Sequence, residues 1–273
     1  MEEEGEKKDF ISNYFLQLFS TSVSVDEGQL QRLISVVQPR VTPAMNAQLM
    51  SEFIEEEIKQ HLFAIGDLKP PGPDSLPTVF YKTFWDVVGV WLTREVMEVL
   101  KGGRILASWN EMTIALIPKT EKPERVIDLR PINLCNVIYK VVSKVLSNRL
   151  REVLPAIITP NQSAFVPRCL ISDNILIAYE LTHYLLNKRE GELGYAAIKL
   201  DMSKTYDRVE WCFLEKMMRR LGFHDSWIGL IMECVSTVKY RVKVNGDLSN
   251  IFCPATRFET RGPVITLPIF IVC

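Results

Sequence analysis

One carboxylate stands where an apolar run of the sequence meets a polar turn. The run YAAIKL ends at Asp201, and an aromatic residue and a second acid, Tyr206 and Asp207, follow five and six positions later. A carboxylate at the end of a buried strand is rigidly placed to bind a hard metal ion. Asp and Ser also favour turns and helix N-caps, so the segment DMSKTYD can equally begin a helix. At the level of this segment, both interpretations stay open.

The composition is that of a globular chain. Its 273 residues are 47% hydrophobic and 24% charged, enough for one large domain or two small ones. Six scattered cysteines include no C-x-x-C pair, so neither a zinc site nor a disulfide framework is expected. The start, MEEEGEKKDF, lacks the apolar region of a signal peptide, and the run PVITLPIFIVC is too short to span a membrane. We expect a reduced, intracellular protein with no membrane partner.

Charge is distributed unevenly although the formal net charge is only −1. Residues 1–57 hold eleven acids and four bases, whereas residues 119–151 hold eight bases and three acids. A polyanionic partner would favour the second block. A solvated helix face is the alternative, and charge by itself favours that alternative.

The segment 136–154 has the clearest helical pattern in the chain. Its apolar residues recur at spacings of three and four, which predicts one buried stripe. The stripe comprises Ile138, Val141, Val142, Val145, Leu146, Leu150 and Val153. The opposite face carries Lys140, Lys144, Ser147 and Arg151.

Similar patterns predict the remaining elements and the fold class. Helices are predicted at 9–20, 45–65, about 80–100, 174–187 with Asp173 as its N-cap, 211–222 and 225–237. Within 45–65 one face carries Phe53, Ile54, Ile58, Leu62 and Ile65. Strands are predicted at 111–118 and 194–201, with a hairpin at 239–252 that turns at Asn245–Gly246. Helices followed by strands and helices of uneven length indicate an α+β fold.

Two further segments have two interpretations each. LKPPGPDSLP, at 68–77, holds four prolines in ten residues and is either a linker or a shaped loop. In the first strand of the hairpin, Lys239, Arg241 and Lys243 share one face, which is either solvated or in contact with a phosphate backbone. No phosphate-binding glycine loop and no glycine-flanked serine nucleophile stands out, so common nucleotide-binding folds and hydrolase triads have no support.

Four stretches resemble, in order, the reverse transcriptases of non-LTR (LINE-type) retrotransposons, especially those of plants. They are PPGPDSLPTVFYKTFWDVVG, IALIPKTEKPERVIDLRPINLCNVIYKVVSKVLSNRL, NQSAFVPRCLISDNILIAYE and AAIKLDMSKTYDRVEW. The resemblance runs from about residue 9 to the end of the sequence. It implies the fingers and part of the palm of a right-hand polymerase, without a thumb. The implied parts are a helical region at 1–66, a proline-rich segment and helix at 67–110, and a reverse transcriptase domain at 111–273.

The resemblance also implies roles for individual residues in nucleotide addition, with Mg²⁺ as cofactor and an RNA template, a DNA primer and deoxynucleotides as partners. Asp201 matches the first metal-binding carboxylate, and the carbonyl of Met202 would be a second metal ligand. Tyr206 matches an aromatic residue under the sugar, which favours deoxynucleotides by excluding a 2′-hydroxyl. Lys119 and Arg130 match positions that face the triphosphate. Arg130 is the better candidate because its fork suits phosphate oxygens, and the proline after it is expected to stiffen the loop that aims it.

By the same resemblance, Lys140, Lys144 and Arg151 would face the template backbone or solvent. Gly262 is a retained glycine in a segment that packs against the templating base pair. Elsewhere the chain departs from the family, which has APGPDGLP for PPGPDSLP and QSAFVPGR for QSAFVPRC. The departures nearer the end of the sequence are Arg168, Cys169, Phe258, Arg261 and Pro263.

The family supplies its other catalytic carboxylates from an ADD hairpin, and no two adjacent aspartates occur in this sequence. We therefore expect a domain truncated before that motif, located in the nucleus or cytoplasm and without polymerase activity of its own. Two alternatives are a non-catalytic retrotransposon relic with residual nucleic-acid binding and an unrelated intracellular helical interaction module.

Overall fold

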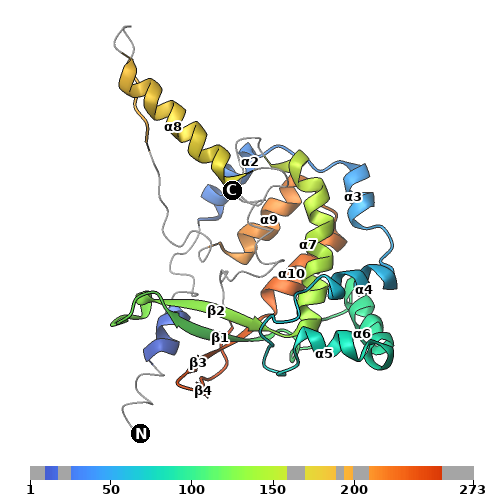
Figure 1. The fold of residues 1–273 in the computed structure, drawn as a ribbon. Coiled ribbons are helices and arrows are strands. Elements are labelled where there is room, and N and C mark those ends of the chain that lie inside the picture. Colours follow the sequence, from blue (N-terminus) through green and yellow to red (C-terminus); the bar gives the residue numbers. More distant parts are fainter. Residues whose placement is uncertain (1–9, 18–25, 159–169, 189–193, 199–208, 254–273) are drawn as a thin grey trace.

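Figure 1 shows the computed structural model, which describes residues 10–17, 26–158, 170–188, 194–198 and 209–253. Within these ranges, helices are combined with a four-stranded sheet. This mixed arrangement agrees with the predicted α+β class. None of the described helices is long and apolar enough to cross a membrane.

Most of the helices precede or separate the strands of the sheet. The helices are α2 (Glu27–Val36), α3 (Pro43–Leu49), α4 (Glu55–Phe63), α5 (Thr78–Thr83), α6 (Trp85–Leu100), α7 (Val137–Ile157), α8 (Ile171–Asn187), α9 (Trp211–Leu221) and α10 (Asp225–Ser236), and residues 10–17 are also helical. The strands are β1 (Glu111–Pro118), β2 (Leu129–Cys135), β3 (Lys239–Val244) and β4 (Asp247–Leu248), with a 3-10 turn at Val126–Asp128.

The sheet joins strands that are far apart in the sequence. Its order is β2-β1-β3-β4, with β1 antiparallel to β2 and parallel to β3. Parallel neighbours require a long crossover, and helices α7 to α10 lie between β2 and β3 along the chain. Asn245 and Gly246 close the predicted hairpin with φ angles of 50° and 96°, the positive values that a type I′ turn requires.

Helix α7 forms the centre of the hydrophobic core. All seven residues of its predicted stripe are buried, and α3, α4 and α6 contact the helix. Ser147 does not lie on the opposite face as predicted, since only 2% of it is exposed. Its hydroxyl donates to the Ser143 carbonyl at 2.8 Å, and this bond satisfies the polar group inside the core.

Long-range hydrogen bonds join the N-terminal helices to α9. The backbone amides of Arg40 and Val41 both donate to the Leu221 carbonyl, at 3.0 and 2.9 Å. Gly222 ends α9 with a φ of 96°, as its sequence position predicts, and its carbonyl accepts from the Asn46 side chain at 2.7 Å. These bonds fix the region before the proline-rich segment against the later part of the chain.

The predicted helix at 45–65 is in fact two helices, α3 and α4. Phe53 between them is buried as predicted, but Ile54 is 54% exposed and has an extended backbone. Three carbonyls in the interruption accept hydrogen bonds from the Arg149 side chain instead of from amides one turn later. A distant arginine on α7 therefore replaces the helical bonds that the local pattern predicts.

The predicted helix at about 80–100 is also interrupted, at Phe84, where the backbone leaves the helical region between α5 and α6. Lys82 on α5 donates to the Ile65 carbonyl at 2.7 Å, which attaches this short helix to the end of α4. Gly102 follows α6 with a φ of 98°, in agreement with the predicted stop.

The region around α8 differs most from the prediction. Figure 1 shows α8 extending away from the other helices, and Leu176, Tyr179 and other apolar side chains on it are exposed. Asp173, predicted as the N-cap, lies inside the first turn, where its carboxylate accepts the Leu170 amide at 3.1 Å. Residues 194–198 form no strand and are exposed, contrary to the predicted buried strand. The remainder of that predicted strand lies outside the described residues.

Ser75 has a backbone conformation that favours glycine. Its φ is 59°, and its amide donates to the Gly72 carbonyl at 3.0 Å. The family stretch APGPDGLP has glycine at this position. A residue with a side chain loses about 1–2 kcal/mol of stability in the left-handed region, and glycine avoids this penalty. Part of the gain from glycine is offset, because glycine also increases the conformational entropy of the unfolded chain.

We therefore expect Ser75→Gly to raise the free energy of unfolding by about 0.5–1 kcal/mol in a urea titration. Ser75→Ala retains the side-chain penalty and should unfold at the wild-type midpoint. A lower midpoint for the glycine variant would show that the serine side chain is favourable in this turn.

Candidate nucleotide and nucleic-acid interface

The β1–β2 hairpin places two of the predicted site residues near its turn. Arg130 lies directly opposite Ile117, so the two side chains point to the same side of the hairpin. Lys119 is two residues beyond Ile117 and its amide continues the ladder by donating to the Asp128 carbonyl at 2.8 Å. Lys119 and Arg130 therefore both lie near the turn end of the hairpin.

The side chains of Lys119 and Arg130 differ in whether they already bind another residue. The Lys119 Nζ donates to the Ile127 carbonyl at 2.8 Å, so this amine helps to close the turn. Arg130 is exposed, and its side chain makes no hydrogen bond or ion pair with any residue in the described ranges. Its guanidinium is therefore available for an anion. Arg130 belongs to strand β2 rather than to the loop that the sequence predicts.

The turn of the hairpin is held by its own charges. The Arg125 amide donates to Asp128 Oδ2 at 3.0 Å, and the Arg125 guanidinium lies 3.4 Å from Asp128 Oδ1. The hydrogen bond from the Arg125 amide is the main cause that lowers the pKa of Asp128. Because Asp128 is engaged with Arg125, it does not neutralise Arg130.

The proline-rich segment is a shaped loop packed against the start of α7. Asn136 donates to the Ser108 carbonyl at 2.8 Å, and its Oδ1 accepts the Asp74 amide at 3.3 Å. A Cβ on Gly72 would lie 2.1 Å from the same Oδ1 atom, so the loop requires glycine there. An asparagine just before a helix usually predicts a cap, but Asn136 makes no cap bond and bridges two segments instead.

Lys140 contributes to the same packing. Its Nζ donates to the Pro70 carbonyl at 2.6 Å, and burial is the main cause that lowers the pKa of its amine. The negative charge of Asp74 acts in the opposite direction. The structure thus shows Lys140 fixing the proline-rich loop in place.

Lys144 and Arg151 continue along α7 from Lys140. The Lys144 Nζ lies 3.5 Å from the Ala64 carbonyl. Its pKa is lowered first by burial and then by the positive charges of Arg151 and Lys69. Arg151 is exposed, and no hydrogen bond or ion pair joins its side chain to another described residue. Of the three bases predicted on this face, Arg151 is the one fully open to a ligand.

The other predicted site residues lie outside the described ranges: Asp201, Met202, Tyr206 and Gly262. The departures from the family at Arg168, Cys169, Phe258, Arg261 and Pro263 lie outside them as well. In the part of the chain that the structure describes, no group of three or more His, Cys, Asp or Glu side chains could hold a metal ion.

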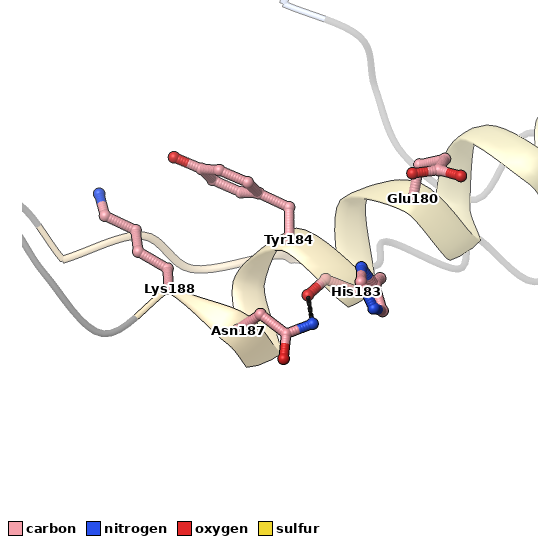
Figure 2. A pocket seen from close by; sticks show the side chains of 5 residues that line it. All are labelled: Glu180, His183, Tyr184, Asn187 and Lys188. Carbon is pink, nitrogen blue, oxygen red and sulfur yellow. Dashed lines mark hydrogen bonds between the residues drawn. The ribbon is translucent and has the colours of Figure 1, made fainter.

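A surface hollow on α8 contains none of the predicted site residues. Figure 2 shows its lining, which comes from the end of this one helix: Glu180, His183, Tyr184, Asn187 and Lys188. The Asn187 side chain donates to the His183 carbonyl at 2.9 Å, an ordinary bond within a helix. A hollow formed along one exposed helix does not bring distant groups together, so it is not a candidate active site.

Comparison with known proteins adds independent evidence. The sequence model of the family "Reverse transcriptase (RNA-dependent DNA polymerase)" matches residues 117–257, slightly more than half of the chain. The match includes Lys119, Arg130 and Asp201.

Three similar proteins come from transposable elements. The "Transposon TX1 uncharacterized 149 kDa protein" of Xenopus laevis is 30% identical over 211 residues, which cover 77% of this chain and 16% of that protein. The "Retrovirus-related Pol polyprotein from type-1 retrotransposable element R2" of Popillia japonica is 24% identical over 184 residues, 66% of this chain and 24% of that protein. The "Probable RNA-directed DNA polymerase from transposon BS" of Drosophila melanogaster is 21% identical over 249 residues, 90% of this chain and 27% of that protein.

The chain thus spans about a quarter or less of the length of these relatives. The family match lies over the basic hairpin and α7, and it disfavours the alternative of an unrelated helical interaction module. The chain belongs to the reverse transcriptase (RNA-dependent DNA polymerase) family and is a reverse transcriptase domain of the non-LTR retrotransposon type.

Proposed function

We propose that this chain forms the fingers and part of the palm of a polymerase that extends a DNA primer on an RNA template. One observation supports the proposal: a single family match spans both the open Arg130 on the β1–β2 hairpin and Asp201, which matches the family's first metal-binding carboxylate. In this reading residues 1–66 precede the fingers, residues 67–110 lead into them and residues 111–273 hold the polymerase domain. The protein would act in the nucleus or cytoplasm.

Arg130 is proposed to bind the triphosphate of the incoming deoxynucleotide. Its exposed guanidinium has no partner within the described ranges, and a planar fork can bind two phosphate oxygens at once. Lys119 lies near the same end of the hairpin and adds positive charge close to Arg130, although its amine also donates to the Ile127 carbonyl. We infer that Arg130 contributes most of the contact energy and that Lys119 supports it.

Asp201 is proposed to hold Mg²⁺ together with the carbonyl of Met202, since hard divalent cations prefer oxygen ligands. Bound Mg²⁺ neutralises charge that develops on the transferred phosphoryl group and on the leaving pyrophosphate. Tyr206 is proposed to lie under the sugar and exclude a 2′-hydroxyl, and Gly262 to lie near the templating base pair. These roles rest on the family positions of the four residues.

The basic face of α7 is proposed to lie near the template backbone. Arg151 is the residue best placed to contact phosphate, because the Lys140 and Lys144 amines approach the carbonyls of Pro70 and Ala64. In this proposal Lys140 and Lys144 act mainly by shaping the loop beside the template and add a diffuse positive field.

Arg130→Ala is expected to weaken deoxynucleotide binding about tenfold, because one charge-assisted bidentate contact with phosphate is lost. The measurement is the dissociation constant of a deoxynucleotide for the 273-residue chain bound to a chain-terminated primer on an RNA template, with Mg²⁺. Asp201→Asn is expected to remove the Mg²⁺ dependence of this binding.

The matched control for Arg130→Ala is Lys122→Ala, which removes one exposed charge from the same hairpin. Arg130→Lys should fall between wild type and Arg130→Ala, since it keeps the charge but loses the fork. Equal affinities for wild type, Arg130→Ala and Lys122→Ala would refute the proposed role of Arg130.

A second candidate function is nucleotide and nucleic-acid binding without polymerisation. Two-metal transfer needs more than one carboxylate, and no two adjacent aspartates occur in the 273 residues. The same complexes distinguish the two functions when the terminated primer is replaced by an extendable one. Extension that is lost in Asp201→Asn would establish polymerase function, whereas nucleotide binding without extension would establish the second function.

A further inference from the structure

The parallel pairing of β3 with β1 places a second row of bases beside the hairpin. In the register of these strands Arg241 lies opposite Thr113, and Lys243 lies opposite Ala115. Thr113 and Ala115 share a face of β1 with Ile117, which is itself opposite Arg130. Lys239, Arg241 and Lys243 therefore point to the same side of the sheet as Arg130.

Burial confirms which side of the sheet this is. The alternate residues of the same strands, such as Met112 and Ile114 on β1 and Tyr240 and Val242 on β3, are buried in the core. The bases lie on the other side, where Arg130 and Lys243 are exposed, Lys239 and Arg241 are half-buried, and Thr113 beside Arg241 is buried. We call this side the basic sheet face, and its cations are Arg130, Lys239, Arg241 and Lys243.

The charge of the basic sheet face is largely uncompensated. Among the residues of β1, β2 and β3 that point to this side, Glu111 is the one acid. The Arg241 Nε lies 2.7 Å from Glu111 Oε1, an ion pair whose angle does not make it a hydrogen bond. The Lys239 and Lys243 side chains make no hydrogen bond or ion pair with another described residue, although the Lys239 amide donates to the Asn110 carbonyl at 3.0 Å. Glu111 thus neutralises the charge of Arg241, whereas the charges of Lys239 and Lys243, on either side of Arg241 along β3, are not neutralised by it.

The spacing of the cations suits a long polyanion better than a single small anion. Arg130 and Lys243 lie on strands separated by β1, so about 10 Å of sheet lies between them. The aliphatic side chains of Ala115, Ile117 and Ile132 occupy that interval. Two rows of cations separated in this way can contact different phosphates of one polynucleotide chain. The aliphatic side chains between the rows would then lie beneath its sugars.

We infer that the basic sheet face binds the sugar-phosphate backbone of a polynucleotide, with Lys239 and Lys243 as phosphate contacts on β3. This inference rests on the proposed function, because it extends the surface around Arg130 to a second hairpin. It adds a contact that follows from the β1–β3 register, and these two lysines lie more than 100 residues from Arg130 in the sequence.

The double substitution Lys239→Gln and Lys243→Gln tests the inference on the 273-residue chain. Affinity is measured by fluorescence anisotropy for single-stranded RNA, single-stranded DNA and an RNA–DNA duplex of one sequence, without nucleotide or Mg²⁺. The salt series runs from about 50 to about 300 mM. We expect about tenfold weaker binding at about 100 mM salt, and a slope of log affinity against log salt that is shallower by about 1.5. The probe that loses most affinity identifies the strand that this face holds.

The matched control is the double substitution Arg94→Gln and Lys101→Gln, which removes the same charge from exposed positions on and just after α6. An unchanged salt slope in the β3 variant, or an equal loss in the α6 variant, would overturn the inference. Urea unfolding at the wild-type midpoint shows that both variants are folded. Because no deoxynucleotide is present, failure of this test is distinct from failure of the role proposed for Arg130.

Discussion

Replacing Arg149 by alanine is expected to lower the free energy of unfolding by about 3–5 kcal/mol, the usual loss when one partner of a buried ion pair is removed. The Arg149 and Glu57 side chains are only 11% and 18% exposed. Arg149 binds both carboxylate oxygens of Glu57, with Nε to Oε1 at 2.9 Å and Nη2 to Oε2 at 2.6 Å. Without the guanidinium, the Glu57 charge would remain partly buried and unpaired.

The ion pair is only part of what Arg149 contributes. Its other donors bind the carbonyls of Leu49, Ser51 and Glu52, and the guanidinium carbon lies 3.7 Å from the centre of the Phe53 ring. These are the carbonyls left unpaired where the predicted helix 45–65 is interrupted. Loss of Arg149 would therefore remove the hydrogen bonds that hold the connection between α3 and α4. It would also remove the ion-pair partner of Glu57.

Two variants distinguish the effect of the guanidinium geometry on stability from the effect of losing a positive charge. Arg149→Lys keeps the charge but cannot bind a carboxylate and three carbonyls together, so we expect it to lose about 2 kcal/mol. Arg94→Ala removes an exposed arginine paired with its neighbour Glu95 and should change stability by less than about 0.5 kcal/mol. The measurement is urea unfolding followed by circular dichroism. A midpoint for Arg149→Ala close to that of Arg94→Ala would contradict the structural role described for Arg149.

Gly72→Ala is expected to cost about 3 kcal/mol, at the upper end of the usual penalty for overpacking. A Cβ on Gly72 would lie 2.4 Å from the Asn136 backbone nitrogen and 2.6 Å from the Cys135 carbonyl carbon. Both are backbone atoms at the junction of β2 and α7, so they cannot move aside as a flexible side chain would. The loop would have to leave the start of α7 and lose the contacts of Asn136 with Asp74.

Gly229→Ala is the matched control. Gly229 lies within α10 and an added Cβ would meet no atom within 4 Å, so alanine should raise stability by about 0.5–1 kcal/mol. Hydrogen exchange in residues 66–77 locates the effect, since faster exchange is expected there in Gly72→Ala alone. Wild-type stability and exchange in Gly72→Ala would support the linker interpretation of the proline-rich segment.

The sequence predicts those helices and turns that depend on residues close together in the chain. Helices α7, α9 and α10 follow their apolar spacing, and Gly222 and the Asn245–Gly246 pair end an element by allowing positive φ. The sequence does not predict strand β2, because Pro131 lies inside it and a proline disfavours a central strand. The structure accommodates Pro131 because β2 is at the edge of the sheet.

Features that depend on distant residues could not be predicted in this way. The interruption near Phe53 depends on Arg149, and the position of Lys140 depends on the Pro70 carbonyl. For the site, the resemblance predicts that Lys119 and Arg130 both face the triphosphate, and in the structure Lys119 lies just beyond the paired strands that hold Arg130. That Lys243 shares a side of the sheet with Arg130 follows from a parallel pairing that no local pattern indicates.

The pairing of β1 with β3 also has a consequence for synthesis of the protein on the ribosome. Glu111 of β1 pairs with Lys239 of β3, and 127 residues lie between them. At translation rates of about 5–20 residues per second, β1 waits about 6–25 s for this neighbour. During that time its edge can pair with another nascent chain. We therefore expect slower translation between these strands to increase aggregation, and chaperones that cover exposed strand edges to reduce it.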